Sequence, residues 1–465
     1  MGFAAQYARA IKNDGFSWYH LEPHLSLTGV QATHRYSVLP GSEPVLLAFL
    51  LHSIIKQNAQ QNDLPITILR AIPNLTEQEV ANRTGLSIEI IREITDTLIG
   101  SDSPLLMAGG VSTAQEKGLE TAVLAALIQY ILGMPENTID FSMPMDYSNV
   151  GSLRDVSSWM KQLDNDRVGV LMLSKTDPAN LLPADFAFLD RMKKAQLTVG
   201  MSDTMNDTVR ECDVILPLSH TLESWGDASP YKGLFSIYQP ALEPQYDSLS
   251  EGDILLKLMN QSDMPSQTYQ DFLKARWQDK FGETKSREIL QQGFYEESIS
   301  PVSVRLSANT VSAFLSQVQF PNGNSTPVLV FAPSIRSFDG RSKDLPLLTE
   351  IPDPITTITY GGWLSVSPEN ARDLGLKDHD EVDITYDEGS IKLPVKIQQL
   401  LAKDVFMVQR DIVHMATTKI DERSGEGSWF SRNIKISKTG RLIAMPILSP
   451  AMWRTIFPLL GRRST

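Results

Sequence analysis

Cysteine is nearly absent from this sequence of 465 residues, which contains only Cys212. A single thiol cannot form an intramolecular disulfide, and it cannot supply the thiolates that hold an iron–sulfur cluster. Among the seven histidines, only His20 and His24 have the i, i+4 spacing of a metal-binding helix, and Pro23 between them prevents a regular helix. The sequence therefore predicts no iron–sulfur cluster and no zinc or di-metal site in this chain.

Long hydrophobic runs are also missing. The longest, residues 45–55, has about half the length that a bilayer-spanning helix needs, and His52 interrupts it. The first fifteen residues contain Arg9, Lys12 and Asp14 and lack the apolar core of a secretory signal. We therefore expect no signal peptide and no transmembrane segment in this chain, so any membrane association would run through a partner.

Positive charge is in the minority, with 42 lysines and arginines against 55 acidic residues and a net charge of −13. Nucleic acid favours a basic protein surface, so we expect no nucleic-acid partner. The sequence also lacks the glycine pattern of a dinucleotide-binding turn and the P-loop pattern, which disfavours a stand-alone nucleotide-binding enzyme.

Helix and strand patterns alternate through the first two thirds of the chain, as is typical of α/β domains with parallel sheets. We predict one such domain over residues 1–140, a second over 141–320, and a β-rich barrel domain over 321–465 that begins with a linker at 321–325. The predicted strands are 17–22, 35–39, 105–108, 168–173, 197–199, 214–216, 328–331, 356–360, 381–386, 390–398 and 405–408. The predicted helices are 44–56, 88–99, 114–132, 206–211 and 368–374.

Two helix starts have recognisable capping residues. Ser42 is placed as an N-cap, and Glu43 follows in the first turn, where a negative charge suits the helix dipole. Thr76 and Glu79 have the spacing of a capping box, which predicts a further helix start.

Three loops are predicted to meet at one edge of the second sheet, because the carboxyl ends of parallel strands lie together. They are residues 174–178, 201–204 and 217–233. Residues 168–173, before the first loop, are continuously apolar, which predicts a strand covered on both faces. Residues 214–216, before the third loop, are predicted to be an interior strand. The third loop is long and rich in polar and aromatic residues, as binding or interface loops are.

Residues 222–227 of this loop, with the sequence Leu-Glu-Ser-Trp-Gly-Asp, resemble a segment of the molybdopterin-type oxidoreductases. The likeness is closest to the large subunit of alternative complex III and of polysulfide-reductase-like complexes. Further matching segments follow the family order: 21–29 with 40–43, 177–178, 237–240, 338–341 with 350–356, and 364–376.

The resemblance covers only the C-terminal half of such a subunit. It implies two Rossmann-like parallel-sheet domains, followed by a double-psi-like β-barrel that binds a molybdopterin guanine dinucleotide. The cysteine motif and the molybdenum ligand of the family's N-terminal portion have no counterpart here. The cofactor contacts that the resemblance implies are Glu22, Ser26, Thr28, Ser174, Thr176, Asp177, His220, Glu223, Trp225 and Asp227.

Structural roles compete with each of these assignments. The first three residues could instead cap a strand–loop junction, and the next three could form a turn. His220 beside carboxylates could handle protons, or the acidic residues could fix the loop while Trp225 anchors a neighbouring subunit. The sequence departs from the family at three places, since His24 replaces an arginine, Ser174 replaces a glycine, and Gly361-Gly362 replaces an aspartate–asparagine pair.

The resemblance implies a subunit, or a split half, of a molybdopterin-type oxidoreductase in a respiratory, quinol-oxidising electron-transfer complex. Its partners would be the N-terminal half or a cysteine-rich iron–sulfur subunit, with a membrane quinol-interacting subunit contacted indirectly. The location would be peripheral on the membrane, periplasmic by family. Independently of the resemblance, the apolar and basic composition of residues 445–460 suggests docking on a partner or a membrane surface, with a solvated terminus as the alternative. The alternative is a non-catalytic scaffold that keeps the fold without a bound pterin, and by either account this chain alone is not catalytic.

Overall fold

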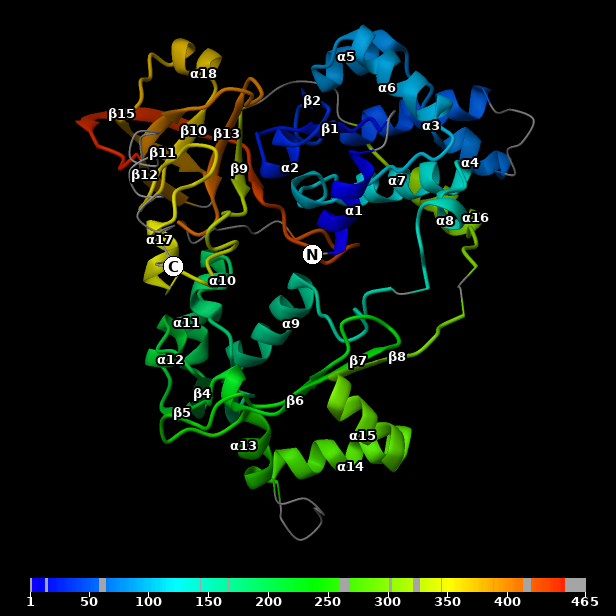
Figure 1. The fold of residues 1–465 in the computed structure, drawn as a ribbon. Coiled ribbons are helices and arrows are strands. Elements are labelled where there is room, and N and C mark those ends of the chain that lie inside the picture. Colours follow the sequence, from blue (N-terminus) through cyan, green and yellow to red (C-terminus); the bar gives the residue numbers. More distant parts are fainter. Residues whose placement is uncertain are drawn as a thin grey trace, which may run out of the picture. The chain divides into compact units, whose positions relative to one another are not determined.

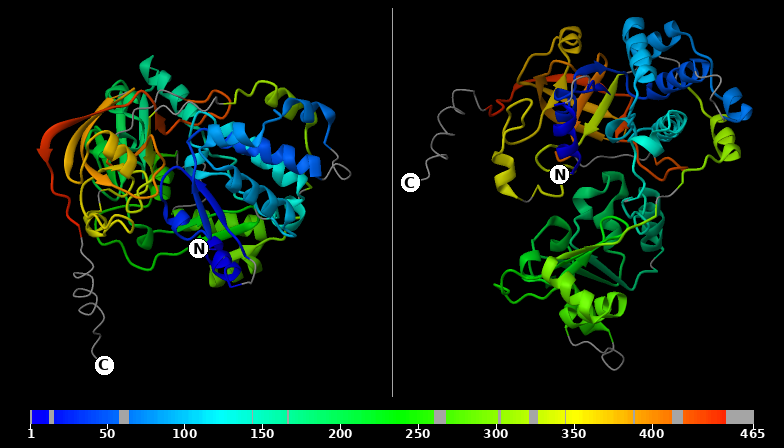
Figure 2. Two further views of the ribbon diagram at one scale, coloured as in Figure 1. Left: turned by 90° about the horizontal axis from the view of Figure 1, so that it is seen from above. Right: turned by 45° about the vertical axis from the view of Figure 1, so that its right-hand side comes forward.

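The computed structural model describes residues 2–12, 16–57, 64–142, 144–165, 167–259, 268–300, 303–320, 327–343, 345–387, 389–412 and 420–447. The chain forms two compact units, which Figures 1 and 2 show as ribbons. Unit 1 contains residues 1–134 and 306–465, and unit 2 contains residues 135–305 between them. The division at residues 140 and 320 stays a prediction, because this grouping does not define domains inside unit 1.

Helices dominate the N-terminal part of unit 1, around a short parallel pair of strands. The strands are β1 (Tyr19–Glu22) and β2 (His34–Ser37), as the sequence predicted. The helices are α1 (Gly2–Ala10), α2 (Leu27–Val30), α3 (Glu43–Gln57), α4 (Ile66–Ala71), α5 (Glu77–Thr84), α6 (Ile88–Gly100), α7 (Gly118–Ile131), the short α8 (Met134–Asn137) at the boundary with unit 2, and α16 (Ala308–Leu315).

Helix α3 is apolar nearly all round and lies at the centre of this part, packed against α5, α6 and α7. Its residues Leu51 and Ile54 are fully buried with Leu124 and Ile128 of α7. Among the described residues, no helix is long and apolar enough to cross a membrane.

The predicted strand at 105–108 is wrong. Its backbone finds side-chain partners instead of a β-ladder, since Gln129 Nε2 donates to Leu106 O and the Leu106 N–H donates to Met134 Sδ. Leu105 and Met107 are left exposed. A run of four apolar residues therefore became an extended connection.

The C-terminal part of unit 1 is a curled seven-stranded sheet in the order β14-β9-β13-β10-β12-β11-β15. β9 pairs parallel with β13 and β10 pairs parallel with β12, while the other pairs are antiparallel. The strands are β9 (Val328–Ala332), β10 (Leu364–Val366), β11 (Asp380–Tyr386), β12 (Gly389–Ile397), β13 (Val405–Gln409), β14 (Phe430–Ser431) and β15 (Lys435–Leu442).

Four predicted strands of this part are confirmed, and one is wrong. Residues 356–360 contain only an isolated bridge from Ile358 to Ile447, because the Asp353 carboxylate binds the N–H groups of Ile355 and Thr356 in a tight turn. The predicted helix at the family segment 364–376 is present as α18 (Pro368–Asp373), and α17 (Pro346–Glu350) was not predicted. The predicted linker at 321–325 and the part of the predicted docking tail beyond residue 447 lie outside the described residues.

Unit 2 contains two separate sheets. The first is parallel, in the order β3 (Val170–Ser174), β4 (Leu197–Ser202), β5 (Val214–Pro217), and is the predicted α/β sheet. The second is antiparallel, and its strands β6 (Gly226–Ala228), β7 (Leu234–Tyr238) and β8 (Phe294–Glu296) were not predicted. The helices are α9 (Leu153–Asp164), α10 (Pro178–Leu181), α11 (Phe188–Met192), α12 (Asp207–Arg210), α13 (Glu251–Leu258), α14 (Tyr269–Phe281) and α15 (Glu283–Gln292).

Two predictions about the parallel sheet are wrong. β3 is not covered on both faces, since Val170 is 56% exposed and Met172 is 36% exposed. β5 lies at the edge of the sheet and is mostly exposed, so it is not an interior strand. An apolar run marks a strand but does not show which neighbours will cover it.

The buried cluster around α3 generates a first prediction. Leu51→Ala should lower the free energy of unfolding of unit 1 by about 2–5 kcal/mol, because Leu51 is fully buried and its removal leaves a cavity. Leu258→Ala on α13, where the side chain is 64% exposed, is the matched control and should cost less than about 0.5 kcal/mol. Chemical denaturation measures both; similar losses for the two variants would contradict the assignment of the core.

Candidate functional site

The first predicted group lies where β1 ends. Glu22 is buried, and its Oε1 accepts hydrogen bonds from Arg35 Nε at 2.7 Å and from the Ser26 N–H at 3.1 Å. His20 Nε2 lies 3.2 Å from its Oε2. A Cβ on Gly29 would stand 1.9 Å from Glu22 Oε1, so glycine is required for this close approach. The Glu22 carboxylate is therefore held inside the unit by its own chain.

Ser26 and Thr28 follow Glu22 on the short helix α2. Ser26 is the N-cap, and its Oγ accepts a hydrogen bond from the Gly29 N–H at 3.0 Å. Thr28 is exposed. In this group the geometry matches the capping alternative for Ser26.

The pKa values of Glu22 and of its neighbour His24 are both lowered, but for different reasons. Burial alone would raise the pKa of Glu22, but hydrogen bonds from His20, Ser26 and Arg35 outweigh it and lower this pKa to about 2. Burial lowers the pKa of His24 to about 4, so its imidazole is neutral at neutral pH. Its Nδ1 is buried without a hydrogen-bond partner among the described residues. A neutral imidazole cannot replace the arginine that the family carries at this position.

The second predicted group lies at the carboxyl edge of the parallel sheet in unit 2. The three predicted loops start side by side there, since the Lys175 N–H donates to Met201 O at 2.9 Å and the Leu218 N–H donates to Ser202 O at 3.0 Å. Asp177 Oδ1 accepts hydrogen bonds from Thr208 Oγ1 at 2.6 Å and from the Thr208 N–H at 3.1 Å. The Thr176 carbonyl accepts a bond from Asn206 Nδ2 at 3.4 Å. Ser174 Oγ is buried and has no partner among the described residues. Within this group, Ser174 Oγ is the side-chain polar atom that is both buried and without a partner among the described residues.

The third predicted group does not converge on one point. His220 and Glu223 form a reciprocal cap of a short 3₁₀-helix, in which Glu223 Oε2 accepts the His220 N–H at 2.9 Å. Asp227 lies on β6, in the other sheet, and accepts a hydrogen bond from Trp277 Nε1 at 3.0 Å. Trp225 packs in the same aromatic cluster as Trp277.

Cys212, which lies between α12 and β5 of the parallel sheet, is half-buried. Burial and the nearby Asp213 carboxylate raise the pKa of its thiol, so the sulfur stays protonated at neutral pH. It is therefore a poor nucleophile and a poor metal ligand. No group of three or more potential metal-ligating side chains occurs among the described residues.

Two arginines that the sequence analysis missed lie at the carboxyl ends of the parallel strands β9 and β13. The Arg410 N–H donates to Ala332 O at 2.9 Å, which joins the two strand ends. Arg336 Nη2 donates to Gly361 O at 3.2 Å. Arg336 Nε and Nη1 and Arg410 Nε are all buried with no hydrogen-bond partner among the described residues.

The surroundings of Arg410 explain why its charge needs a partner. Its guanidinium carbon lies 3.3 Å from the centroid of the Trp429 ring. Burial lowers the pKa of Arg410 to about 10, while the Asp339 carboxylate raises it and Arg341 lowers it further. Asp339 itself binds Arg341 in two hydrogen bonds. Asp411 uses Oδ2 with Ser337 and leaves Oδ1 without a partner.

This geometry suits an oxyanion, because guanidinium N–H groups recognise phosphate or carboxylate oxygens and a buried donor without a partner is costly. The sequence contained a partial signal, since 338–341 is one of the family-like segments between the two arginines. It could not show that β9 and β13 are paired, and that pairing brings Arg336 and Arg410 to one edge.

Glu43 lies in the first turn of α3, as the sequence predicted. It is buried at the start of α3, where Oε2 accepts hydrogen bonds from the Gly41 N–H at 2.7 Å and Gln115 Nε2 at 2.8 Å. Burial raises its pKa to about 7, although these hydrogen bonds lower it. The group is therefore a buried carboxyl that titrates near neutral pH.

The Glu22–Arg35 pair generates a second prediction. Because the folded-state pKa lies near 2 and the ordinary value is 4.5, Glu22→Gln should cost roughly 3 kcal/mol of unfolding free energy at pH 7. The difference between wild type and variant should be complete above pH 4.5 and shrink as the pH falls toward 2. Glu77→Gln, which breaks the exposed pair with Arg92, is the control and should cost at most about 1 kcal/mol. Denaturation curves at pH 7, 4 and 3 measure this, and a pH-independent difference would refute the pairing.

Comparison with known proteins finds a relative in sequence and solved structures with a similar fold. The molybdopterin-binding-like subunit of menaquinone reductase from Nitratidesulfovibrio vulgaris is 23% identical over 431 residues, which cover 87% of this chain. The chain spans 60% of the length of that curated relative. No family model matches the sequence.

Acetylene hydratase from Pelobacter acetylenicus has a similar fold, with a TM-score of 0.65 at 13% sequence identity. The match covers 94% of this chain and 76% of that protein. At this identity the likeness concerns the fold alone. The sequence likeness to a molybdopterin-binding-like subunit, over most of the chain, confirms the resemblance to the molybdopterin oxidoreductases that the sequence motifs indicated.

Proposed function

We propose that this chain is a subunit of a respiratory electron-transfer complex, in which it contributes part of the cofactor-carrying fold of a molybdopterin-type oxidoreductase. The support is the likeness to a menaquinone reductase subunit, which runs along 87% of the chain rather than through one motif. The finer assignment, a quinol-oxidising complex of the alternative complex III type, rests on residues 222–227 and the other family-like segments.

One observation carries the assignment of a cofactor. Arg336 and Arg410 present three buried guanidinium nitrogens at the edge of the β9–β13 pair, and none of them has a hydrogen-bond partner in the part of the chain that the structure describes. A molybdopterin carries phosphate, and its dinucleotide form carries a pyrophosphate, so an anionic group of the cofactor would complete these donors. When bound, such a cofactor supplies two-electron redox chemistry at its metal.

The protein groups around this edge have separable roles. Arg336 and Arg410 would bind the anion, and the Trp429 ring stacked on Arg410 holds that guanidinium in place. The ion pair of Asp339 and Arg341 lies close enough to Arg410 to affect the pKa of its guanidinium. Water is excluded from the unpaired N–H groups by burial, which strengthens any hydrogen bond formed there.

The originally predicted contacts fit a cofactor less well. Glu22, Ser26 and Asp177 already bind groups of their own unit. Their internal hydrogen bonds support a structural role, in which they shape the loops at two sheet edges. Ser174 is the exception, because its Oγ is buried and unpaired.

Electron carriers would have to come from a partner, because Cys212 alone cannot bind an iron–sulfur cluster. The partner in this proposal is the N-terminal half or a cysteine-rich iron–sulfur subunit, with the membrane quinol-interacting subunit beyond it. The chain itself would act as a peripheral subunit.

A scaffold without pterin is the second candidate, and specific observations favour it. His24 is neutral where the family has an arginine, and Ser174 places a Cβ where the family has glycine. Both changes weaken a phosphate contact. The two candidates differ in one measurable quantity, the metal and pterin content of the complex.

The third prediction tests this difference. The complex purified through this chain should contain molybdenum or tungsten, and fluorescent pterin after oxidation, at near one equivalent per chain. Arg336→Gln with Arg410→Gln should lower both contents at least about tenfold, since a hydrogen bond to a charged group contributes roughly 1.5–3 kcal/mol. Arg441→Gln, which alters an exposed arginine of β15, is the control and should leave both unchanged.

The wild-type complex decides between the candidates. If it contains neither metal nor pterin while its subunits remain assembled, the scaffold is correct and the cofactor assignment is lost. A cysteine-rich partner should copurify in either case. Separation of this chain from every such partner at physiological salt would contradict the proposed subunit role itself.

A further inference from the structure

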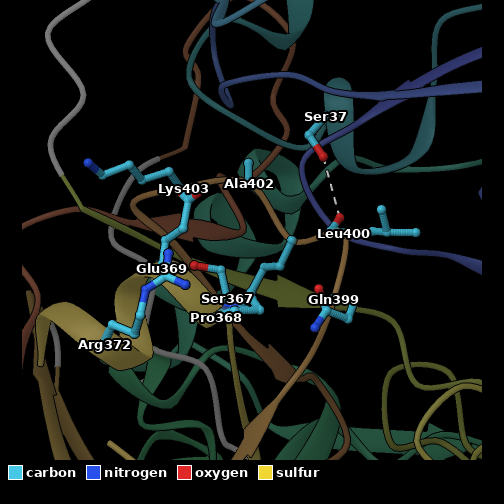
Figure 3. A pocket seen from close by; sticks show the side chains of 10 residues that line it. Ser37, Ser367, Pro368, Glu369, Arg372, Gln399, Leu400, Ala402 and Lys403 are labelled. Carbon is cyan, nitrogen blue, oxygen red and sulfur yellow. Dashed lines mark hydrogen bonds between the residues drawn. The ribbon is translucent and has the colours of Figure 1, made fainter. Parts of the chain in front are cut away.

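A cavity lies in unit 1, away from the two buried arginines. It has a volume of about 450 Å³ and lies between the end of β2, the start of α18 and the loop 399–403 (Figure 3). This volume is in the range of small-molecule sites. Its polar lining includes Ser37, Glu369, Arg372, Gln399 and Lys403.

The walls of this cavity are fixed by hydrogen bonds between separate segments. Arg35 Nη2 donates to Leu400 O at 2.7 Å, and the Ala402 N–H donates to Pro23 O at 2.9 Å. Below them, buried Asn370 of α18 bonds to the backbone of Asp404 and Val405. The cavity is therefore part of the fold, built where the β1–β2 segment is attached to the curled sheet.

Two cations of this lining have no acidic partner. Arg372 and Lys403 make no ion pair within the described residues, although nearby Lys396 and Lys438 are paired with Asp378 and Asp380. In a chain with a net charge of −13, two unpaired cations on one cavity form a local positive site. Figure 3 labels Arg372, Lys403 and Glu369 among the side chains that line this cavity.

We propose that this cavity binds a phosphate ester that also carries hydroxyl groups. Arg372 and Lys403 would pair with the phosphate, because a guanidinium and an ammonium are the side chains that recognise its oxygens. The Glu369 carboxylate would repel the phosphate and accept hydrogen bonds from the hydroxyl groups, which orients the ester in the cavity. The Gln399 amide adds a donor and an acceptor.

This site is separate from the Arg336 and Arg410 edge. Lys403 precedes β13 and Arg410 follows it, so the two sites lie at opposite ends of that strand. The five residues of β13 correspond to roughly 16 Å of extended chain. The proposal therefore does not depend on whether the chain holds a pterin.

The same chemistry occurs in soluble sugar or glycerol phosphates and in the head group of phosphatidylglycerol. The fourth prediction uses the purified complex, with sn-glycerol 3-phosphate as the soluble probe and phosphatidylglycerol vesicles, against phosphatidylcholine vesicles, as the lipid probe. We expect at least one probe to bind: calorimetry would detect binding of the soluble probe, and flotation would detect binding of the vesicles. Failure of both probes would overturn the proposal.

Variants test the assigned residues. Arg372→Gln with Lys403→Gln should weaken the observed binding at least about tenfold, since it removes two charge-assisted contacts. Both side chains are exposed and unpaired, so the unfolding temperature without ligand should not change. Lys392→Gln with Arg441→Gln removes the same charge from β12 and β15 and should leave binding unchanged. Equal weakening by the two pairs would show a general charge effect and contradict the site.

The hydroxyl requirement has its own test. Glu369→Gln should tighten binding of inorganic phosphate by removing repulsion, and should reduce the preference for glycerol 3-phosphate over inorganic phosphate. An unchanged preference would refute the role of Glu369. Loss of metal and pterin in the Arg336 and Arg410 variants, measured separately, bears only on the proposed function.

Discussion

The buried ion pair of Glu22 and Arg35 holds unit 1 together at the point where its two parts meet. Arg35 binds the Glu22 carboxylate on one side and the Leu400 carbonyl on the other, so one guanidinium joins β1, β2 and the loop before β13. A buried charge pair of this kind is costly to desolvate, and its partners must be complete for it to persist. Here they are complete, since Ser26 and His20 supply the remaining contacts. The cavity of about 450 Å³ lies at this junction, and the hydrogen bonds of the junction fix its walls.

The same principle separates structural polar residues from binding residues in this chain. Glu22, Asp177 and Glu223 are conspicuous in sequence, yet their carboxylate oxygens bind backbone or side-chain groups of their own unit. Arg336 and Arg410 are less conspicuous, yet three of their guanidinium nitrogens are buried and have no hydrogen-bond partner within the described ranges. Because an unpaired buried donor lowers stability, it persists where a ligand completes it or where function requires it. The unused polar atoms are therefore a better guide to a site than residue type.

Local pattern predicted the elements whose signals are local. Capping chemistry identified the start of α5 at Thr76, and alternation identified β11 and β12. The predictions failed where contacts with residues far along the sequence decide the structure. Residues 105–108 form no strand, because the backbone of Leu106 bonds to side chains of α7 and Met134. The apolar run of β3 did not show that one face of the strand is exposed. The site at Arg336 and Arg410 required the parallel pairing of β9 with β13, which no sequence spacing expresses.

The edge with Arg336 and Arg410 and the cavity with Arg372 and Lys403 differ in how much free energy the protein loses when no anion is bound. Arg410 is stacked on Trp429 and largely buried, so leaving it without an anion sacrifices hydration that the protein only partly replaces. Such a site favours a ligand that stays bound through the life of the protein, as a prosthetic group does. Arg372 and Lys403 remain hydrated when their cavity is empty, so ligand exchange there costs little. The first arrangement suits a permanent cofactor and the second a ligand that comes and goes, which is why the two ends of β13 need not share one function.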